Sequence, residues 1–310
     1  MTVRSPDGPA TADVSALVAK LRRIPDSARR FVETPASARA RFLLRPAVLD
    51  LLTDAGLPVR RIDGTPHYDR HDLTNCSLHL SVGAAARTAR RFWPAALRRV
   101  ADAGQARYEV QYQIRCPAPG HAATCSFVLV LPGGRVLERT VADGSGLRIA
   151  VQVSVEGRWP DLPAAVRRLL DDAVAEVEFM MLPTEVRYDT GFVRASGLGD
   201  CAGVTRLLVR RGRAAGLAAR PAFGLIVAPP FAAEHFWAEF LVDGRWVPVD
   251  PVLIRTMLGW GVLDPAEWHP HRSIGAILSR IADDGVVLAA HDGWAVPFTL
   301  PTQLLPEEPR

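Results

Sequence analysis

The chain has 310 residues, of which 48% are apolar and 23% are charged, as in an ordinary globular protein that forms one large domain or two smaller ones. Its 37 basic and 33 acidic residues leave a formal charge of +4, too small an excess to indicate nucleic-acid binding. Residues 1–18 lack a signal-peptide pattern and no apolar run reaches the length of a membrane span, so we expect a cytoplasmic protein without a membrane partner.

The four cysteines, at positions 76, 116, 125 and 201, do not form a disulfide framework in a chain of this size. Cys116 and Cys125 flank a turn that contains Pro and Gly, and they could approach each other across a hairpin. In a reducing compartment we expect free thiols, and a free Cys201 can act as a thiolate.

The first hundred residues predict a helical lobe. After a loose tail over 1–12, apolar spacing predicts helices over 13–24, over 37–55 with a kink at Pro46, and over 83–103. Arginines on the last helix could contact an acidic carrier or substrate, although a solvated helix face is the simpler interpretation.

A group of potential metal ligands lies between these helices. It consists of His67, Asp69, His71, Asp72, Cys76 and His79. The spacing of these residues matches no familiar zinc pattern, so we expect a solvated loop and no metal site.

From Tyr108 the hydrophobic period changes to two. The pattern predicts strands over 108–114, 125–131, 135–141 and 147–155, separated by turns rich in Pro and Gly. Four such strands in succession indicate a small antiparallel sheet.

A helix is predicted over 162–181, ahead of the strongest functional pattern in the chain. That pattern begins with Gly-Asp-Cys at 199–201 and continues as an amphipathic helix over 202–215. Cys201 is expected in the first helical turn, with Asp200 as the N-cap. The unpaired N–H groups and the positive end of the helix dipole would favour a thiolate there.

A β-hairpin is predicted over 235–250, because two runs of aromatic and branched residues flank the turn signal Asp243-Gly244. The register that this turn sets makes His235 and Asp250 diagonal neighbours on one face of the hairpin. Their backbones would lie about 7–8 Å apart, a distance that an imidazole and a carboxylate can span.

Beyond the hairpin, a helix is predicted over 273–282, and strands over 286–291 and 294–300. Three histidines of this region could border a catalytic cleft, although surface or structural roles are the simpler interpretation. They are His269, His271 and His291.

Several ordered motifs over 165–255 resemble the core of the transglutaminase-like superfamily. They are Gly-Asp-Cys before a helix, the segment 212–220 leading into a strand, the triplet 235–237, and the run Trp-Val-Pro-Val-Asp-Pro at 246–251. The resemblance implies a papain-like α+β fold, in which a helix bearing the cysteine packs on an antiparallel sheet bearing the histidine and the aspartate.

The resemblance also implies roles for individual residues. By position, Cys201 resembles the family's nucleophile, His235 its base and Asp250 the residue that orients the histidine. No cofactor and no metal are expected. The oxyanion donor stays unassigned, because the tryptophan that some relatives use has a counterpart only in Trp159, 42 residues before the cysteine. Candidate substrate-binding residues are Trp237, Trp246 and Asp200.

We expect an N-terminal helical lobe over 1–105, an antiparallel β module over 106–158 and a catalytic core over 159–310. The added lobe resembles the architecture of stand-alone amide synthases in bacterial natural-product pathways. That likeness implies an acyl donor that is a small molecule or is tethered to a carrier protein, together with an amine acceptor. A cysteine protease or amidase, and an inactive binding protein on the same fold, remain as alternatives.

Overall fold

The computed structural model describes residues 9–121, 123–142, 144 and 146–306. Most of the predicted loose tail therefore lies outside the described residues. Among the helices of these ranges, none combines the length and the apolar character needed to cross a membrane.

The structure divides into two compact units. Unit 1 comprises residues 1–91 and 176–204, and unit 2 comprises residues 92–175 and 205–310. The division at residues 105 and 158 that the sequence suggests stays a prediction.

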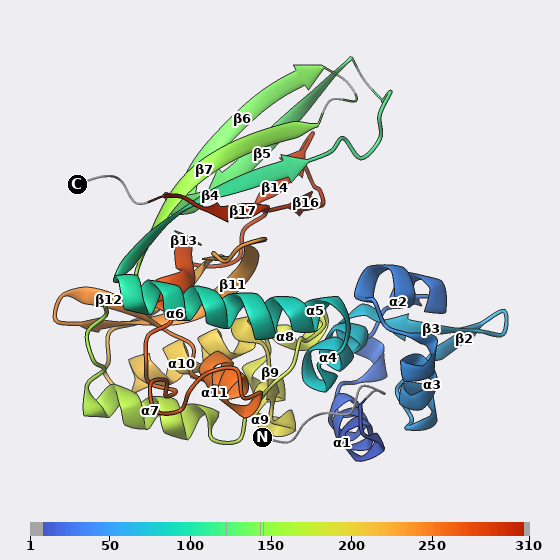
Figure 1. Cartoon of the computed structure of the whole chain (residues 1–310), viewed down its shortest axis with the longest axis horizontal. Helices are drawn as coiled ribbons and strands as arrows, with labels where there is room; N and C mark the ends of the chain where they lie inside the picture. The colour runs from blue at the N-terminus through green and yellow to red at the C-terminus, as the bar shows by residue number, and fades with distance from the viewer. Residues whose placement is uncertain (1–8, 122, 143, 145, 307–310) are drawn as a thin grey trace. The chain divides into compact units, whose positions relative to one another are not determined.

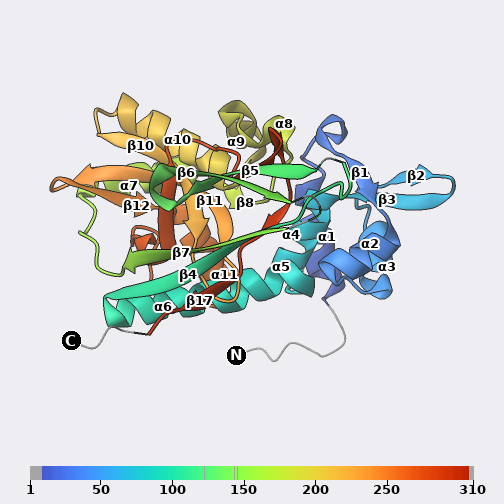
Figure 2. The ribbon, with the colours of Figure 1, turned by 90° about the horizontal axis from the view of Figure 1, so that it is seen from above.

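Unit 1 is mainly helical, as expected for the N-terminal part of the chain (Figure 1). Its principal helices are α1 Thr11–Leu21, α2 Pro35–Phe42, α3 Pro46–Asp54, α4 Arg70–Leu80, α5 Gly83–Arg87, α8 Thr184–Arg187 and α9 Thr190–Ser196. The short strand β1 (Phe31–Glu33) pairs with β3 (Thr65–Asp69), and β3 also forms a projecting hairpin with β2 (Arg60–Ile62) (Figure 2).

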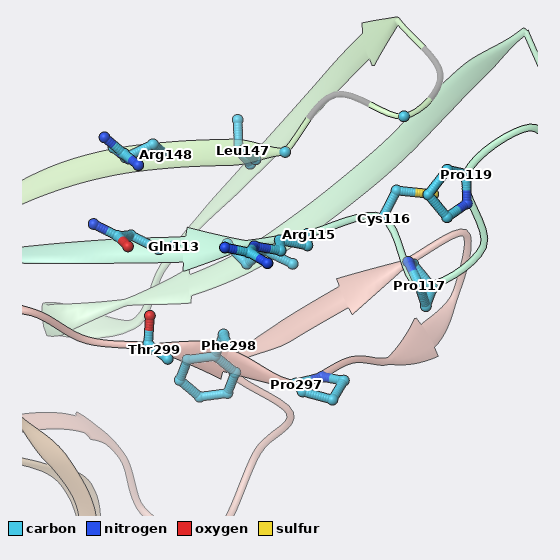
Figure 3. A pocket seen from close by; sticks show the side chains of 13 residues that line it. Gln113, Arg115, Cys116, Pro117, Pro119, Leu147, Arg148, Pro297, Phe298 and Thr299 are labelled. Carbon is cyan, nitrogen blue, oxygen red and sulfur yellow. The ribbon is translucent and has the colours of Figure 1, made fainter.

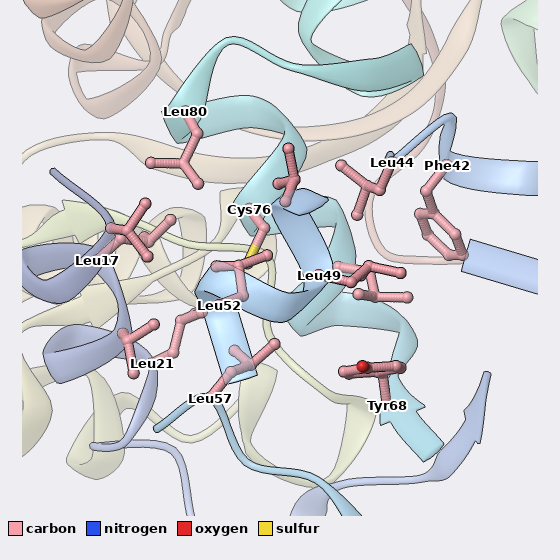
Figure 4. Packing of buried hydrophobic residues seen from close by; sticks show 14 of the residues in the cluster. Leu17, Leu21, Phe42, Leu44, Leu49, Leu52, Leu57, Tyr68, Cys76 and Leu80 are labelled. Atoms are coloured by element: carbon pink, nitrogen blue, oxygen red, sulfur yellow. The ribbon is translucent and has the colours of Figure 1, made fainter. Parts of the chain in front are cut away.

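An aliphatic cluster holds unit 1 together. Leucines of α1, α3 and α4 pack around the buried Cys76 (Figure 4). The same cluster includes Met180, Leu182 and Leu198, which come from the segment directly before the candidate nucleophile. Burial of this apolar surface therefore holds in place the chain segment that leads to Cys201.

Two predictions for unit 1 are wrong. The segment 37–55 forms two helices, because Leu43 adopts a left-handed conformation (φ 56°) after α2 and Pro46 starts α3 at a position where proline is favoured. The segment 67–79, expected as a solvated loop, forms the end of β3 and most of helix α4. Asp69 caps this helix by accepting hydrogen bonds from the N–H groups of His71 (2.7 Å) and Asp72 (3.2 Å).

Unit 2 contains the four predicted strands, which appear as β4 Gln105–Ile114, β5 Thr124–Leu131, β6 Arg135–Ala142 and β7 Leu147–Glu156. They do not form one sheet, because β4 pairs with β7 and β5 with β6. Strands near the C-terminus extend both pairs (Figure 1). These are β14 Ala289–His291, β15 Trp294–Ala295, β16 Phe298–Thr299 and β17 Thr302–Leu304.

A further antiparallel sheet of unit 2 has the order β12-β11-β10-β13. Its strands are β10 Ala219–Ile226, β11 Ala233–Val242, β12 Arg245–Val249 and β13 Leu278–Ala282. The predicted hairpin register is confirmed, since Val242 pairs with Arg245 and Glu239 with Pro248. The helix predicted over 273–282 is wrong: this segment forms the turn Gly275–Ile277 and then β13.

Three helices complete the described part of unit 2, and a fourth belongs to both units. They are α6 Trp93–Ala103, α7 Ala164–Val174 and α11 Pro251–Gly259, while α10 (Cys201–Ala214) begins in unit 1 and continues into unit 2. The helix predicted over 162–181 ends early, because the following β8 (Glu178–Phe179) pairs with β9 (Leu198–Gly199). Gly212 of α10 lies against the sheet, where a Cβ atom would come within 2.8 Å of the Phe240 ring.

Candidate active site

Cys201 is the first residue of helix α10, and the preceding aspartate caps that helix as predicted. The Oδ1 atom of Asp200 accepts a hydrogen bond from the N–H of Gly203 at 3.0 Å, and its carbonyl oxygen accepts one from Val204 at 3.0 Å. Cys201 is 9% exposed. A thiol at this position faces the positive end of the helix dipole.

A partly buried cation compensates the charge of the capping aspartate. Burial raises the pKa of Asp200, whose Oδ2 atom lies 2.9 Å from Nε of Arg187. Burial disfavours the charged guanidinium, but the charges of Asp200 and Cys201 outweigh this effect and raise the pKa of Arg187. Arg187 therefore supplies a permanent positive charge near the cysteine.

Two glycines allow the first turn of α10 to pack closely within unit 1. A Cβ atom on Gly203 would lie 2.6 Å from the carbonyl oxygen of Arg187. A Cβ atom on Gly199 would lie 2.8 Å from the side chain of Val204. The backbone on either side of Cys201 is thus fixed by contacts that admit no larger residue without movement.

In unit 2, the confirmed hairpin register brings His235 and Asp250 together. His235 lies on β11, and Asp250 directly follows β12, where it caps α11. The imidazole Nε2 atom lies 2.9 Å from Oδ2 of Asp250, and Oδ1 of the same carboxylate accepts a hydrogen bond from the N–H of Leu253 at 2.9 Å. Both residues are 4% exposed.

This geometry assigns the two ring nitrogens of His235. A carboxylate only accepts hydrogen bonds, so Nε2 carries a proton and donates it to Asp250. In the neutral imidazole, Nδ1 is then the basic nitrogen. The ring is oriented by a residue that is itself fixed by its role as the N-cap of α11.

A row of side chains along β11 supports the imidazole. The ring of His235 is stacked on that of Trp237, with centroids 6.5 Å apart and an interplanar angle of 16°. The indole N–H of Trp237 donates to Glu239 at 3.1 Å, and Glu239 forms ion pairs with Arg220 and Arg280 at 2.6 and 3.6 Å. The period of two in this row was visible in the sequence, but the partner arginines were not.

The predicted substrate-binding residues have different surroundings. Asp200 is fully buried with its carboxylate engaged, and Trp237 is 1% exposed. Trp246 is half-buried, and the guanidinium of Arg220 lies 4.2 Å from its ring centroid. A role in substrate binding stays a prediction for all three.

The remaining sequence candidates serve other contacts. Trp159 donates its indole N–H to the carbonyl of Glu156 at 2.7 Å. His271 pairs with Asp171 at 2.7 Å. His291 is buried on β14. Arg187 was missed by sequence reasoning, because nothing in its spacing from the cysteine marks it.

The three residues of the predicted catalytic triad are distributed over both units. Cys201 belongs to unit 1, whereas His235 and Asp250 belong to unit 2. The structure brings the histidine and the aspartate together, and the approach of the thiol to the imidazole stays a prediction.

The comparison with protein families finds one match, over a segment of the chain. Residues 150–251 match the model of the transglutaminase-like superfamily, and this segment contains Cys201, His235 and Asp250. This segment, about a third of the chain, therefore resembles the transglutaminase-like core, and the described residues form a mixed fold of helices and sheets.

One similar solved structure bears the name "a Putative Cysteine Protease from Cytophaga hutchinsonii". It shares 12% sequence identity with this chain, with a TM-score of 0.37, over 66% of this chain and 93% of that one. None of the curated proteins matches the sequence.

Proposed function

We propose that this protein is a cysteine-dependent acyltransferase that works through a covalent thioester on Cys201. One observation carries the proposal: a buried histidine–aspartate pair with a 2.9 Å hydrogen bond lies in a transglutaminase-like segment whose helix begins with a cysteine. That combination supplies a nucleophile, a base and a residue that orients the base.

The proposed reaction has two halves. The Cys201 thiolate attacks the carbonyl carbon of the donor, and a sulfur–carbon bond forms while the carbonyl oxygen takes up the negative charge. The tetrahedral intermediate collapses to the thioester, and the leaving group departs with the proton held on Nδ1 of His235. The acceptor then loses a proton to Nδ1 as it attacks the thioester, and the cysteine sulfur is released.

Asp250 acts on the imidazole in both halves of this cycle. Its carboxylate holds Nε2–H, so that the proton exchanged with substrates is the one on Nδ1. Arg187 and the start of α10 favour the charged form of the sulfur before the first attack. These interactions are fixed before any substrate binds, which lowers the cost of reaching the transition state.

We propose an amine as the acceptor and a small-molecule or carrier-tethered acyl group as the donor, so that the product is an amide of bacterial secondary metabolism. The support for this choice is the architecture, in which a long N-terminal segment precedes the matched residues 150–251. Hydrolysis, as in a cysteine protease or amidase, uses the same first half and differs only in the acceptor.

Intact-mass spectrometry with a panel of acyl thioesters and activated amides tests the first half. We expect an added acyl mass that maps to Cys201 and disappears in Cys201→Ala. His235→Ala should slow acylation by orders of magnitude, whereas His269→Ala, at an exposed histidine of the same unit, should leave it unchanged. Absence of an adduct with every donor class would instead indicate an inactive binding protein.

The second half is tested by adding amines to the acyl-enzyme. Under the proposal, the fraction of amide product rises with amine concentration and saturates for a preferred amine. A product that is the free acid at every amine concentration would contradict transfer and indicate a hydrolase.

A further inference from the structure

Four side chains of unit 2, outside the candidate active site, converge on one point. They are Cys116, His121, Cys125 and His291, and one ligand atom of each lies within 4.8 Å of the ligand atoms of the other three. Cys116 and His121 follow β4, Cys125 lies on β5, and His291 ends β14. Two thiols and two imidazoles at one place form a ligand set that zinc prefers.

The distances between these atoms suit a tetrahedral metal ion. The Nε2 atoms of His121 and His291 are 3.2 Å apart, and Sγ of Cys125 lies 3.8 Å from Nε2 of His121. With the usual zinc–nitrogen and zinc–sulfur bond lengths, the edges of a tetrahedron are about 3.3 Å between two nitrogens and about 3.6 Å between nitrogen and sulfur. The observed separations differ from these edges by a few tenths of an ångström.

An aspartate adjoins the two imidazoles. Oδ2 of Asp292 lies 3.4 Å from Nδ1 of His291, the nitrogen that does not face His121, and 3.6 Å from Nε2 of His121. Two hydrogen bonds to Ser126 hold Asp292 in place. The N–H of Ser126 donates to Oδ1 of Asp292 at 2.9 Å, and the N–H of Asp292 donates to the carbonyl of Ser126 at 2.8 Å. A carboxylate behind a ligating histidine is the usual second layer of a zinc site.

Burial separates this cluster from an ordinary surface group of polar residues. Cys116, Cys125 and His291 are buried, and His291 also packs edge-on against the ring of Phe127 at 4.9 Å. Only His121 is exposed. The cluster is therefore enclosed on three sides and is open to entering ions at the fourth ligand.

We propose that these four residues bind a structural Zn²⁺ ion. All four tetrahedral positions would be filled by protein ligands, which is the arrangement of structural sites and leaves no position for a substrate. Binding would release the two thiol protons and would join the segment after β4 to the sheet that contains β5 and β14. This inference departs from the expectation of a protein without a metal.

The ion would also fix one end of a cavity. Cys116 lines a cavity of about 970 Å³, together with Gln113 and Arg148 from β4 and β7 (Figure 3). Phe298 and Thr299 of β16 lie along its side. Coordination of Cys116 would hold this wall against β5, so metal removal should increase the mobility of the segment that follows β4.

Metal analysis of the full chain, purified under reducing conditions, tests the proposal directly. We expect about one zinc per chain in the wild type and in Cys201→Ala, because the active-site thiol takes no part. After chelation, Co²⁺ titration should produce the visible bands of a tetrahedral ion with sulfur-to-cobalt charge transfer. Zinc below stoichiometry that does not rise on reconstitution, or cobalt spectra without thiolate charge transfer, would overturn it.

Substitutions then identify the ligands. His121→Ala removes the exposed ligand and should weaken zinc binding at least 100-fold in a chelator competition, while His269→Ala should bind as the wild type does. Asp292→Asn keeps an acceptor for the Ser126 N–H and should weaken binding about 10- to 100-fold. Retention of wild-type affinity by His121→Ala would contradict the assignment.

Substitution of a buried cysteine can also unfold the protein, so metal binding by these variants is interpreted only where the fold is retained. Cys125→Ser should lose the metal, with its fold checked by circular dichroism; if it does not fold, the chelator and His121→Ala measurements still decide. A disulfide between Cys116 and Cys125 in the purified chain, with no zinc uptake after reduction, would also overturn the proposal.

Discussion

The hydrogen bond from His235 to Asp250 can be dissected because the two oxygens of this carboxylate serve different partners. Oδ2 accepts from the imidazole and Oδ1 accepts from the N–H of Leu253, each at 2.9 Å. Asparagine has only one acceptor oxygen. Asp250→Asn therefore loses the charge of the acceptor in every case, and its single oxygen can serve either the histidine or the cap of α11.

The magnitude follows from the kind of hydrogen bond that is lost. A bond to a charged group contributes about 1.5–3 kcal/mol and a neutral one about 0.5–1.5 kcal/mol, so exchanging one for the other costs about 1–1.5 kcal/mol. At 1.36 kcal/mol per tenfold, this corresponds to a loss of about 5- to 13-fold in the rate of thiolate chemistry. Asp250→Ala removes the whole interaction and should cost about 10- to 150-fold.

The loss should be larger if the asparagine oxygen stays with Leu253. Its NH₂ group would then face Nε2, which would have to accept, and the single proton of the neutral imidazole would move to Nδ1. In a serine triad the equivalent change lowers kcat by about 10⁴-fold. The smaller value above is thus a lower bound for Asp250→Asn.

Alkylation of Cys201 by iodoacetamide measures this effect without knowledge of the substrate. The rate is followed by peptide mass spectrometry between about pH 5 and 9, since the thiolate is the reacting species. Asp243→Asn is the matched control, because it makes the same change in the turn of the same hairpin, where Asn-Gly is also favoured. Urea unfolding of each variant shows whether the N-cap of α11 is lost, since the cap contributes about 0.5–2 kcal/mol to the free energy of unfolding.

If Cys201 of Asp250→Asn is alkylated at the wild-type rate across this pH range, the reasoning is refuted. A loss of rate is expected whether the asparagine oxygen bonds to His235 or to Leu253. A rate loss shared by Asp243→Asn would refute it as well, because the effect would then not belong to the hydrogen bond. Asp250→Ala should remain more active than Cys201→Ala, which has no nucleophile.

Three further predictions concern unit 1. Arg187→Gln removes the cation beside the cysteine, so alkylation of Cys201 at neutral pH should slow, and an unchanged pH profile would contradict this. Burial, with the charges of nearby cations, lowers the pKa of His79 to about 4. As the pH falls, the histidine of the unfolded chain is therefore protonated before that of the folded chain. The free energy of unfolding should decrease by about 2–3 kcal/mol from pH 7 to pH 4.5. In urea titrations, His79→Gln should lose this pH dependence and the hairpin variant His67→Gln should keep it. Gly203→Ala should lower the free energy of unfolding by about 1–3 kcal/mol, because the added Cβ atom would lie 2.6 Å from the carbonyl oxygen of Arg187. This loss should exceed the gain from the better helix propensity of alanine. A more stable variant would contradict the prediction and would show that the backbone moves to make room.

The parts of the site that could be predicted from the sequence are those set by local rules. The turn Asp243-Gly244 fixes a two-residue connection, and the period of two then decides which residues share a face with His235. Asp200 was predicted as a cap because aspartate before an amphipathic run is a local signal. Both predictions depend only on neighbours within a few residues or across one turn.

The failures depend on partners that are distant in the sequence. Residues 278–282 form a strand because they pair with β10, and Gly224 permits an approach in which a Cβ atom would lie 2.1 Å from the carbonyl of Ser279. The sequence placed Cys116 and Cys125 near each other, but His291 reaches His121 across 170 positions. Local spacing carries no information on either contact.

The buried carboxylates near the candidate nucleophile and base differ in what neutralises them. Asp200 pairs with Arg187, and Glu239 pairs with two other arginines. A guanidinium does not release its proton in a protein, and separating a buried pair costs several kcal/mol. Asp250 differs, because its partner His235 is the kind of side chain that gains and loses a proton near neutral pH. Among these described pairs, only the one at His235 contains a basic group that gains and loses its proton near neutral pH, so we expect proton transfer in the proposed reaction to go through this histidine.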